Sequence, residues 1–162
     1  MRLEQREKEL VAIGASIGAS CRPCIEHHLP AGREAGISET ELGDAVATAQ
    51  AVRHEAVELF TARVEELLGH GGPPPEPGAL AETSKARELV ALGASVGANS
   101  HRLLALHIAA ALDAGLTGAQ VEAAFKMAGY VQQRAAEMTA EKARHALEDR
   151  AAGFATAGGG GR

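Results

Sequence analysis

Two cysteines and a histidine have a spacing that suits thiol chemistry. Cys21 and Cys24 are the only cysteines of the chain, and His28 follows Cys24 by four residues. The pattern C-x-x-C-x-x-x-H comes directly after a small-residue break, at the start of an expected helix. A helix N-terminus stabilises an anion and therefore lowers a thiol pKa. A histidine one turn further on can accept the thiol proton. The pattern predicts a reactive dithiol with its own base.

Each cysteine has a predicted role in such a dithiol. Cys24 and His28 lie on the same face of a helix, so Cys24 is the candidate nucleophile. Cys21 is the partner that resolves an oxidised Cys24 into a disulfide. A C-x-x-C pair at a helix start permits both the dithiol and the disulfide without a large backbone movement.

Other interpretations of the same residues remain open. The cysteines could be small buried hydrophobic residues. Cys21, Cys24 and His28, with His27 or Glu9 as a fourth ligand, could also hold zinc, copper or iron, or form a redox sensor. His27 points about 100° away from His28 around the helix, which favours a surface position.

The chain repeats itself at an offset of 79 residues. Residues 9–18, ELVAIGASIG, match residues 88–97, ELVALGASVG, and His28 falls on His107. The cysteines have no counterpart, because their positions hold Ser100 and Leu103 in the second copy. The second copy is therefore predicted to be structural, with His107 in a capping, packing or interface role.

The repeat and the composition divide the chain into four segments. Residues 1–68 form the first repeat, 69–79 a Gly/Pro-rich linker, 80–150 a second repeat without cysteines, and 151–162 a flexible Gly-rich tail. The two repeats are expected to form one helical domain.

Each repeat is predicted to be helical, and no segment alternates like a strand. The first repeat should form helices from Leu3 to about Ala19, from Cys21 to Gly36, and from Ser38 towards Leu67. Gly36 is a predicted C′ glycine, and Ser38 with Glu41 forms a predicted capping box. Pro30 should kink the second helix or remove one of its backbone bonds. The third helix is long enough that a break near residues 53–54 is expected.

Composition excludes several classes of protein. The formal net charge is −5 and no lysine- or arginine-rich block is present, which argues against nucleic-acid binding. No apolar run reaches the roughly 18 residues of a membrane span. The charged N-terminus is not a secretory signal, so a cytoplasmic location is expected. Only four aromatic residues are present, so helices must approach closely, and part of the apolar surface should be buried by oligomerisation.

Glu9, twelve residues before Cys21, completes a longer motif. Position alone favours a surface glutamate, although antiparallel helix packing would bring its carboxylate to Cys24 and His28. The spacing E-x(11)-C-x-x-C-x-x-x-H, followed by Ala-Gly-x-Ser-x-x-Glu, resembles the carboxymuconolactone decarboxylase superfamily. More specifically, it is similar to the alkylhydroperoxidase AhpD-like branch. The alkylhydroperoxidase itself has a histidine where this chain has Pro23.

The resemblance implies a fold and an activity. It implies an all-helical thiol-dependent peroxidase or disulfide oxidoreductase, in which Cys24 attacks a hydroperoxide, Cys21 resolves the sulfenate, and His28 and Glu9 relay the proton. It also implies a dithiol reductant, such as a lipoyl-bearing or thioredoxin-like protein, no bound cofactor, and a homotrimer that mimics a hexamer of single repeats. Lactone decarboxylation is not expected, because the decarboxylases of the superfamily lack the dithiol.

Overall fold

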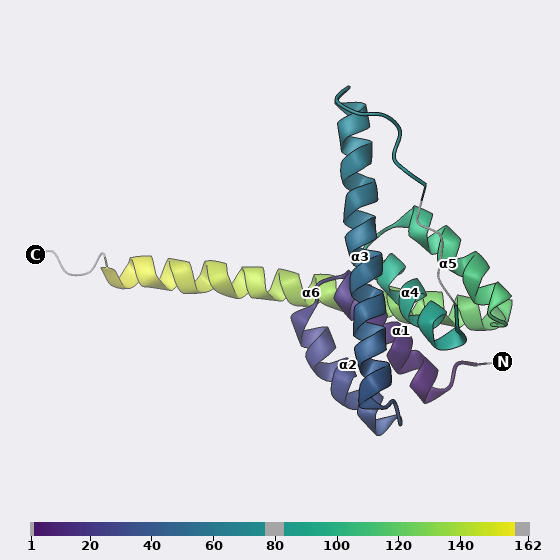
Figure 1. The fold of residues 1–162 in the computed structure, drawn as a ribbon. Coiled ribbons are helices and arrows are strands. Elements are labelled where there is room, and N and C mark those ends of the chain that lie inside the picture. Colours follow the sequence, from purple (N-terminus) through teal and green to yellow (C-terminus); the bar gives the residue numbers. More distant parts are fainter. Residues whose placement is uncertain (1, 77–82, 158–162) are drawn as a thin grey trace, which may run out of the picture.

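The fold is a helical bundle from which two long helices project. The structure, a computed structural model, describes residues 2–76 and 83–157, and within these residues it contains helices and no strand. The predicted all-α class is confirmed. The helices, shown in Figure 1, are α1 (Gln5–Gly18), α2 (Arg22–Glu34), α3 (Glu39–Leu67), α4 (Lys85–Gly97), α5 (His101–Asp113) and α6 (Gly118–Ala157).

Local side-chain chemistry sets the helix limits as predicted. At the start of α3, Ser38 Oγ accepts a hydrogen bond from Glu41 N at 3.3 Å, and Glu41 Oε2 accepts one from Ser38 N at 3.0 Å. Gly36 follows α2 with a φ of 82°, the left-handed conformation that glycine adopts without strain. The capping box and the C′ glycine are therefore both present.

Two features differ from the expectations. First, α3 runs without a break through Arg53 and His54, because the stretch from residue 44 to 68 contains neither glycine nor proline. Second, α6 extends to Ala157, although residues 151–162 were expected to form a flexible tail. Residues 151–157 include four alanines, the residue with the highest helix propensity. Pro30 lies inside α2 on its exposed side, and the helix continues past it with one backbone donor fewer.

Two expected segments lie partly outside the described residues. The predicted linker 69–79 is non-helical as far as residue 76, and residues 77–82 are not described. The same holds for residues 158–162 of the predicted tail. The division of the chain into repeats and linker therefore stays a prediction.

A close crossing of α1 and α4 forms the centre of the bundle. A Cβ atom added to Gly14 would lie 2.1 Å from the carbonyl oxygen of Val90, and one added to Gly93 would lie 2.1 Å from that of Val11. Gly18 and Gly97, one turn further along, are almost as close to the opposite backbone. The close helix approach expected from the small-residue composition is therefore observed, and it depends on glycine.

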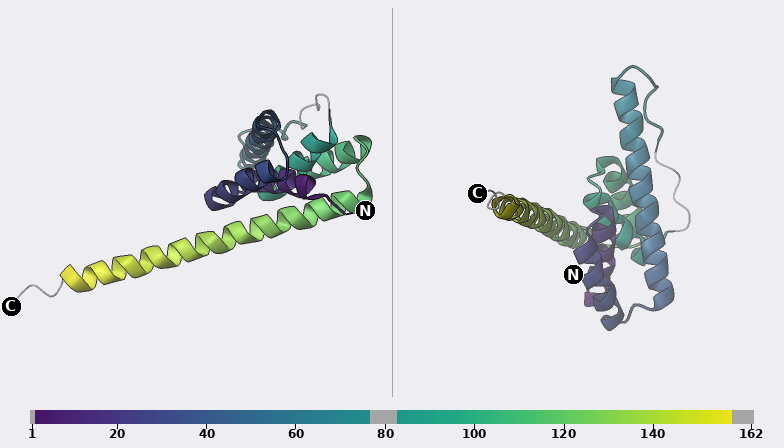
Figure 2. Two further views of the ribbon diagram at one scale, coloured as in Figure 1. Left: turned by 90° about the horizontal axis from the view of Figure 1, so that it is seen from below. Right: turned by 90° about the vertical axis from the view of Figure 1, so that its left-hand side faces the viewer.

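The remaining helices pack around this crossing. The core contains the fully buried side chains of Ile13, Leu89, Leu92 and Leu103. The second half of α3 and the second half of α6 project from the bundle in different directions, as the views of Figures 1 and 2 agree. The bundle holds the N-terminus of α2 against α1, which is where the motif residues lie.

Candidate active site

A tight turn between α1 and α2 positions the two cysteines. α1 ends in a Schellman motif, in which Ser20 N bonds to Ile17 O at 3.0 Å and Cys21 N bonds to Ser16 O at 2.9 Å. Ser20 adopts a φ of 54°, which is unusual for a residue with a side chain. The turn places Cys21 at the N-cap of α2, where its Sγ accepts a hydrogen bond from Cys24 N at 3.3 Å.

Cys21 and Cys24 form a disulfide, with their Cα atoms 5.2 Å apart. Both cysteines are buried, at 7% exposure each, whereas Arg22 and Pro23 between them are exposed. The sulfur atoms therefore lie just below the surface at the head of α2. The structure shows the oxidised form of the pair, and a C-x-x-C at a helix start accommodates this form without breaking the helix.

Glu9 and His28 form a hydrogen-bonded pair beside the disulfide. Glu9 Oε2 lies 2.9 Å from His28 Nδ1, and the two side chains are only 6% and 13% exposed. The other carboxylate oxygen, Glu9 Oε1, accepts a hydrogen bond of 2.7 Å from Gln5 Nε2. The expectation of a surface glutamate, based on position alone, is wrong. The packing of α1 against α2 buries Glu9 and directs it towards His28.

This pairing has a chemical consequence for His28. An ionised carboxylate only accepts hydrogen bonds, so Nδ1 donates its hydrogen to Glu9. The imidazole is then held in the tautomer whose Nε2 can accept a proton. His28 also follows Cys24 by one helical turn, on the same face of α2. The arrangement provides an oriented base on the helix that carries the cysteines.

The structure gives no support to a metal site at these residues. In the chain as described, from residue 2 to 76 and from 83 to 157, no three His, Cys, Asp or Glu side chains are grouped so that they could hold a metal ion. The two sulfurs are bonded to each other, and His27 is exposed. The rings of His27 and His28 meet edge to face, with centroids 4.9 Å apart.

A second glutamate–histidine pair occupies the equivalent place in the other half. Glu88 Oε2 lies 2.8 Å from His107 Nδ1, and the side chains are 0% and 4% exposed. Sequence reasoning expected a capping, packing or interface role for His107 and missed this pair. The signal was available, because Glu and His are separated by 19 residues in both copies.

The second pair has no thiols in the equivalent positions. Ser100 and Leu103 stand where the first half has its cysteines, and Leu103 is completely buried. Glu88 Oε1 has no hydrogen-bond partner, whereas its counterpart Glu9 Oε1 is bonded to Gln5. The glutamate–histidine pair thus occurs both with and without thiols, so its geometry alone does not define a reaction.

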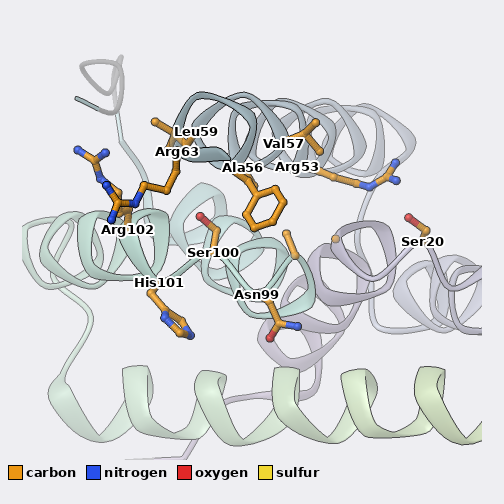
Figure 3. A pocket seen from close by; sticks show the side chains of 13 residues that line it. Ser20, Arg53, Ala56, Val57, Leu59, Arg63, Asn99, Ser100, His101 and Arg102 are labelled. Atoms are coloured by element: carbon orange, nitrogen blue, oxygen red, sulfur yellow. The ribbon is translucent and has the colours of Figure 1, made fainter. Parts of the chain in front are cut away.

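A pocket of about 620 Å³ lies between α3, the end of α1 and the junction of α4 with α5 (Figure 3). Its lining includes Arg53, Arg63 and Arg102 together with apolar residues of α3 such as Val57 and Phe60. Figure 3 shows Arg63 and Arg102 towards one end and Arg53 towards the other. The thirteen lining residues include neither cysteine. They do include Ser20, the residue directly before Cys21.

Fold and site together define a class of protein: an all-helical chain with a C-x-x-C disulfide at a helix N-terminus and a buried glutamate–histidine pair beside it. Residues 2–66 match the carboxymuconolactone decarboxylase family, which supports the resemblance to that superfamily. The matched range contains Glu9, both cysteines and His28. No curated protein and no solved structure matched the chain. Among the described residues, no helix is both long and apolar enough to span a membrane.

Proposed function

We propose that the protein is a thiol-dependent peroxidase and disulfide oxidoreductase of the alkylhydroperoxidase AhpD-like type. The observation that carries the proposal is the Cys21–Cys24 disulfide at the head of α2, with the Glu9–His28 pair next to it. The family match over residues 2–66 supports it. The substrates would be a hydroperoxide as oxidant and a dithiol, such as a lipoyl-bearing or thioredoxin-like protein, as reductant.

The proposed reaction begins with the reduced dithiol. His28 Nε2 takes the proton of the Cys24 thiol, and the thiolate attacks the terminal oxygen of the hydroperoxide. The O–O bond breaks, Cys24 becomes a sulfenic acid, and the alkoxide leaves as an alcohol with the proton from His28. Glu9 stabilises the imidazolium through Nδ1 and acts as a positioning residue for His28.

The second half of the cycle uses Cys21. Its thiol attacks the sulfur of the sulfenic acid, which releases water and forms the Cys21–Cys24 disulfide. An external dithiol then reduces this disulfide by exchange and is itself oxidised to a disulfide. One hydroperoxide and one dithiol thus give one alcohol, one water and one oxidised dithiol. The exposed Arg22 and Pro23 leave the disulfide close to the surface, where a reductant can reach it.

The test measures hydroperoxide consumption with a dithiol reductant. Cys24→Ser should abolish turnover, whereas Cys21→Ser should form a sulfenic acid that dimedone traps. His28→Ala should reduce the rate by at least about 10²-fold, the usual contribution of a general base. His27→Ala is the matched control, since His27 is exposed and lies outside the pair; its rate should stay unchanged. Turnover that survives Cys24→Ser would refute the proposal.

The resemblance also leads us to propose a homotrimer, and a cytoplasmic location remains a proposal. A site that hydroperoxide oxidises once to the disulfide, and that the added dithiol does not reduce again, would instead identify a redox sensor. In the same experiment, hydroperoxide consumption would then stop at one equivalent per chain.

A further inference from the structure

The second half of α3 carries a stripe of exposed apolar side chains. Within the described residues nine large apolar side chains are exposed, and five of them lie on this one segment. These five residues, called here the α3 stripe, are Val57, Phe60, Val64, Leu67 and Leu68. Phe60, one of only four aromatic residues in the chain, is 71% exposed. An isolated exposed apolar residue is ordinary, but a contiguous group indicates an interface.

The spacing of the stripe is that of a helix-packing surface. Val57, Phe60, Val64 and Leu67 follow one another at intervals of three, four and three residues, which is the a/d pattern of a helix seam. The stripe therefore forms a continuous line along one face. It begins beside the pocket of Figure 3, whose wall includes Val57 and Phe60, and continues beyond it.

Among the residues that the structure describes, none covers the stripe. The last buried residue of α3 is Leu59, and the helix continues for two more turns to Leu67. In Figure 1 this part of α3 rises beyond the bundle, and Figure 2 shows it projecting away from α6. Bundle packing alone does not account for these two turns, nor for their apolar residues.

The equivalent part of α6 has the complementary properties. At the offset of 79, the first four stripe positions correspond to Ala136, Thr139, Ala143 and Ala146, all exposed. One helix thus presents large side chains, and the other presents small ones on the same face. Large side chains pack well against small ones, because the two helix axes can approach closely.

The charges of the two segments are also opposite in sign. Residues 53–68 contain two arginines and four glutamates, which give a formal net charge of −2. Residues 132–147 contain three basic and two acidic residues, which give +1. Charged groups beside an apolar seam select the partner and the orientation of the helices.

We propose that the α3 stripe of one copy packs on the face of α6 that contains Ala136, Ala143 and Ala146 in a second copy of this chain. The projecting halves of α3 and α6 diverge within one chain, so they cannot pack on each other. The contact joins two different surfaces, and each copy carries both, so repetition of the contact gives a ring if the rotation between copies closes and an open filament if it does not. The inference is independent of the thiol chemistry.

The first experiment determines the mass of the full chain by light scattering at tens of micromolar. Wild type should have the mass of several chains. Phe60→Glu and Ala143→Glu, one on each surface, should each shift the mass to that of one chain. Leu112→Glu is the matched control, because Leu112 is 47% exposed on α5, outside both arms, and this variant should keep the wild-type mass. A monomeric wild type would overturn the proposal.

The second experiment identifies which surfaces meet and tolerates variants that fold poorly. In a chain with Cys21→Ser and Cys24→Ser, Val64→Cys and Ala143→Cys are introduced singly and together, and a short bismaleimide is added. The combined variant should give covalent multimers, and each single variant should give monomer on a denaturing gel. Dimers from Val64→Cys alone would mean that two α3 stripes meet each other, and this would refute α6 as the partner.

Discussion

The glycines at the α1–α4 crossing allow a sharp prediction about stability. Gly14→Ala places a methyl group 2.1 Å from the carbonyl oxygen of Val90 and 2.9 Å from its carbonyl carbon. Ordinary contact begins at 3.4 Å, so α1 and α4 must separate by about 1.3 Å. The obstacle is backbone, which cannot rotate away as a side chain can. The helices must therefore move apart and lose contacts along the whole crossing.

The size of the effect follows from two opposing contributions. Overpacking of a well-packed core costs about 1–3 kcal/mol. Alanine in place of glycine in a helix interior gains about 1 kcal/mol. Gly43→Ala is the matched control, because Gly43 lies inside α3 with nothing within 4 Å of an added Cβ. Since the gain is common to both variants, it cancels in the comparison, and Gly14→Ala should be less stable than Gly43→Ala by the overpacking cost alone, roughly 1–3 kcal/mol.

Urea denaturation followed by circular dichroism measures this difference. Gly93→Ala should behave like Gly14→Ala, because its added Cβ meets the carbonyl oxygen of Val11 at the same 2.1 Å. The double variant should cost less than the sum of the two single variants, since one separation of the helices relieves both clashes. Equal stability of Gly14→Ala and Gly43→Ala would refute the reasoning.

Three further predictions concern other parts of the chain. Pro30→Ala should raise the free energy of unfolding by up to about 3 kcal/mol, because it restores a backbone donor inside α2. The reverse change at the equivalent position of α5, Ala109→Pro, should lower the free energy of unfolding. Urea midpoints of the two variants that move in the same direction would contradict this. His107→Leu should lower the free energy of unfolding by about 3–5 kcal/mol, because it leaves the buried Glu88 unpaired. The double variant Glu88→Leu with His107→Leu should recover most of that loss in the same denaturation assay. A single variant as stable as the double variant would show that the pair is not coupled. Hydrogen bonds from the backbone and side chain of Ser38, followed by one from Arg6, lower the pKa of the Glu41 carboxyl. The ionised Glu41 therefore contributes to the stability of the fold above its unfolded-state pKa, and this contribution is lost as the pH falls through its folded-state pKa. The stability difference between wild type and Glu41→Gln should therefore shrink on acidification from pH 7 towards pH 3, and a constant difference would count against this assignment.

Short-range features of the sequence predicted most of the helical framework. The Ser38–Glu41 capping box, the glycine at position 36 and the break before Cys21 each act within a few residues, so their effect can be read without knowledge of the fold. The break expected at residues 53–54 is absent. That expectation was based on helix length alone, and no residue there opposes a helix.

The candidate site was predicted only in part. The spacing of Cys21, Cys24 and His28 is local to one helix and needs no tertiary information. Glu9 belongs to another helix, and from its position alone it was expected at the surface. Two arguments pointed to its pairing with His28, namely antiparallel packing of the two helices and the resemblance to a family. The Glu88–His107 pair was not predicted, because no thiol drew attention to it.

The sequence by itself determined the helices, their caps, the internal repeat and the redox-capable C-x-x-C motif, because these depend on interactions between residues close together in the chain. The tertiary structure decided which carboxylates are buried, which histidine nitrogen each one holds, and which apolar residues stay exposed on the projecting arms. These properties depend on how α1 crosses α4 and packs against α2. That packing is the sum of many weak contacts between residues distant in sequence, and no single motif encodes it.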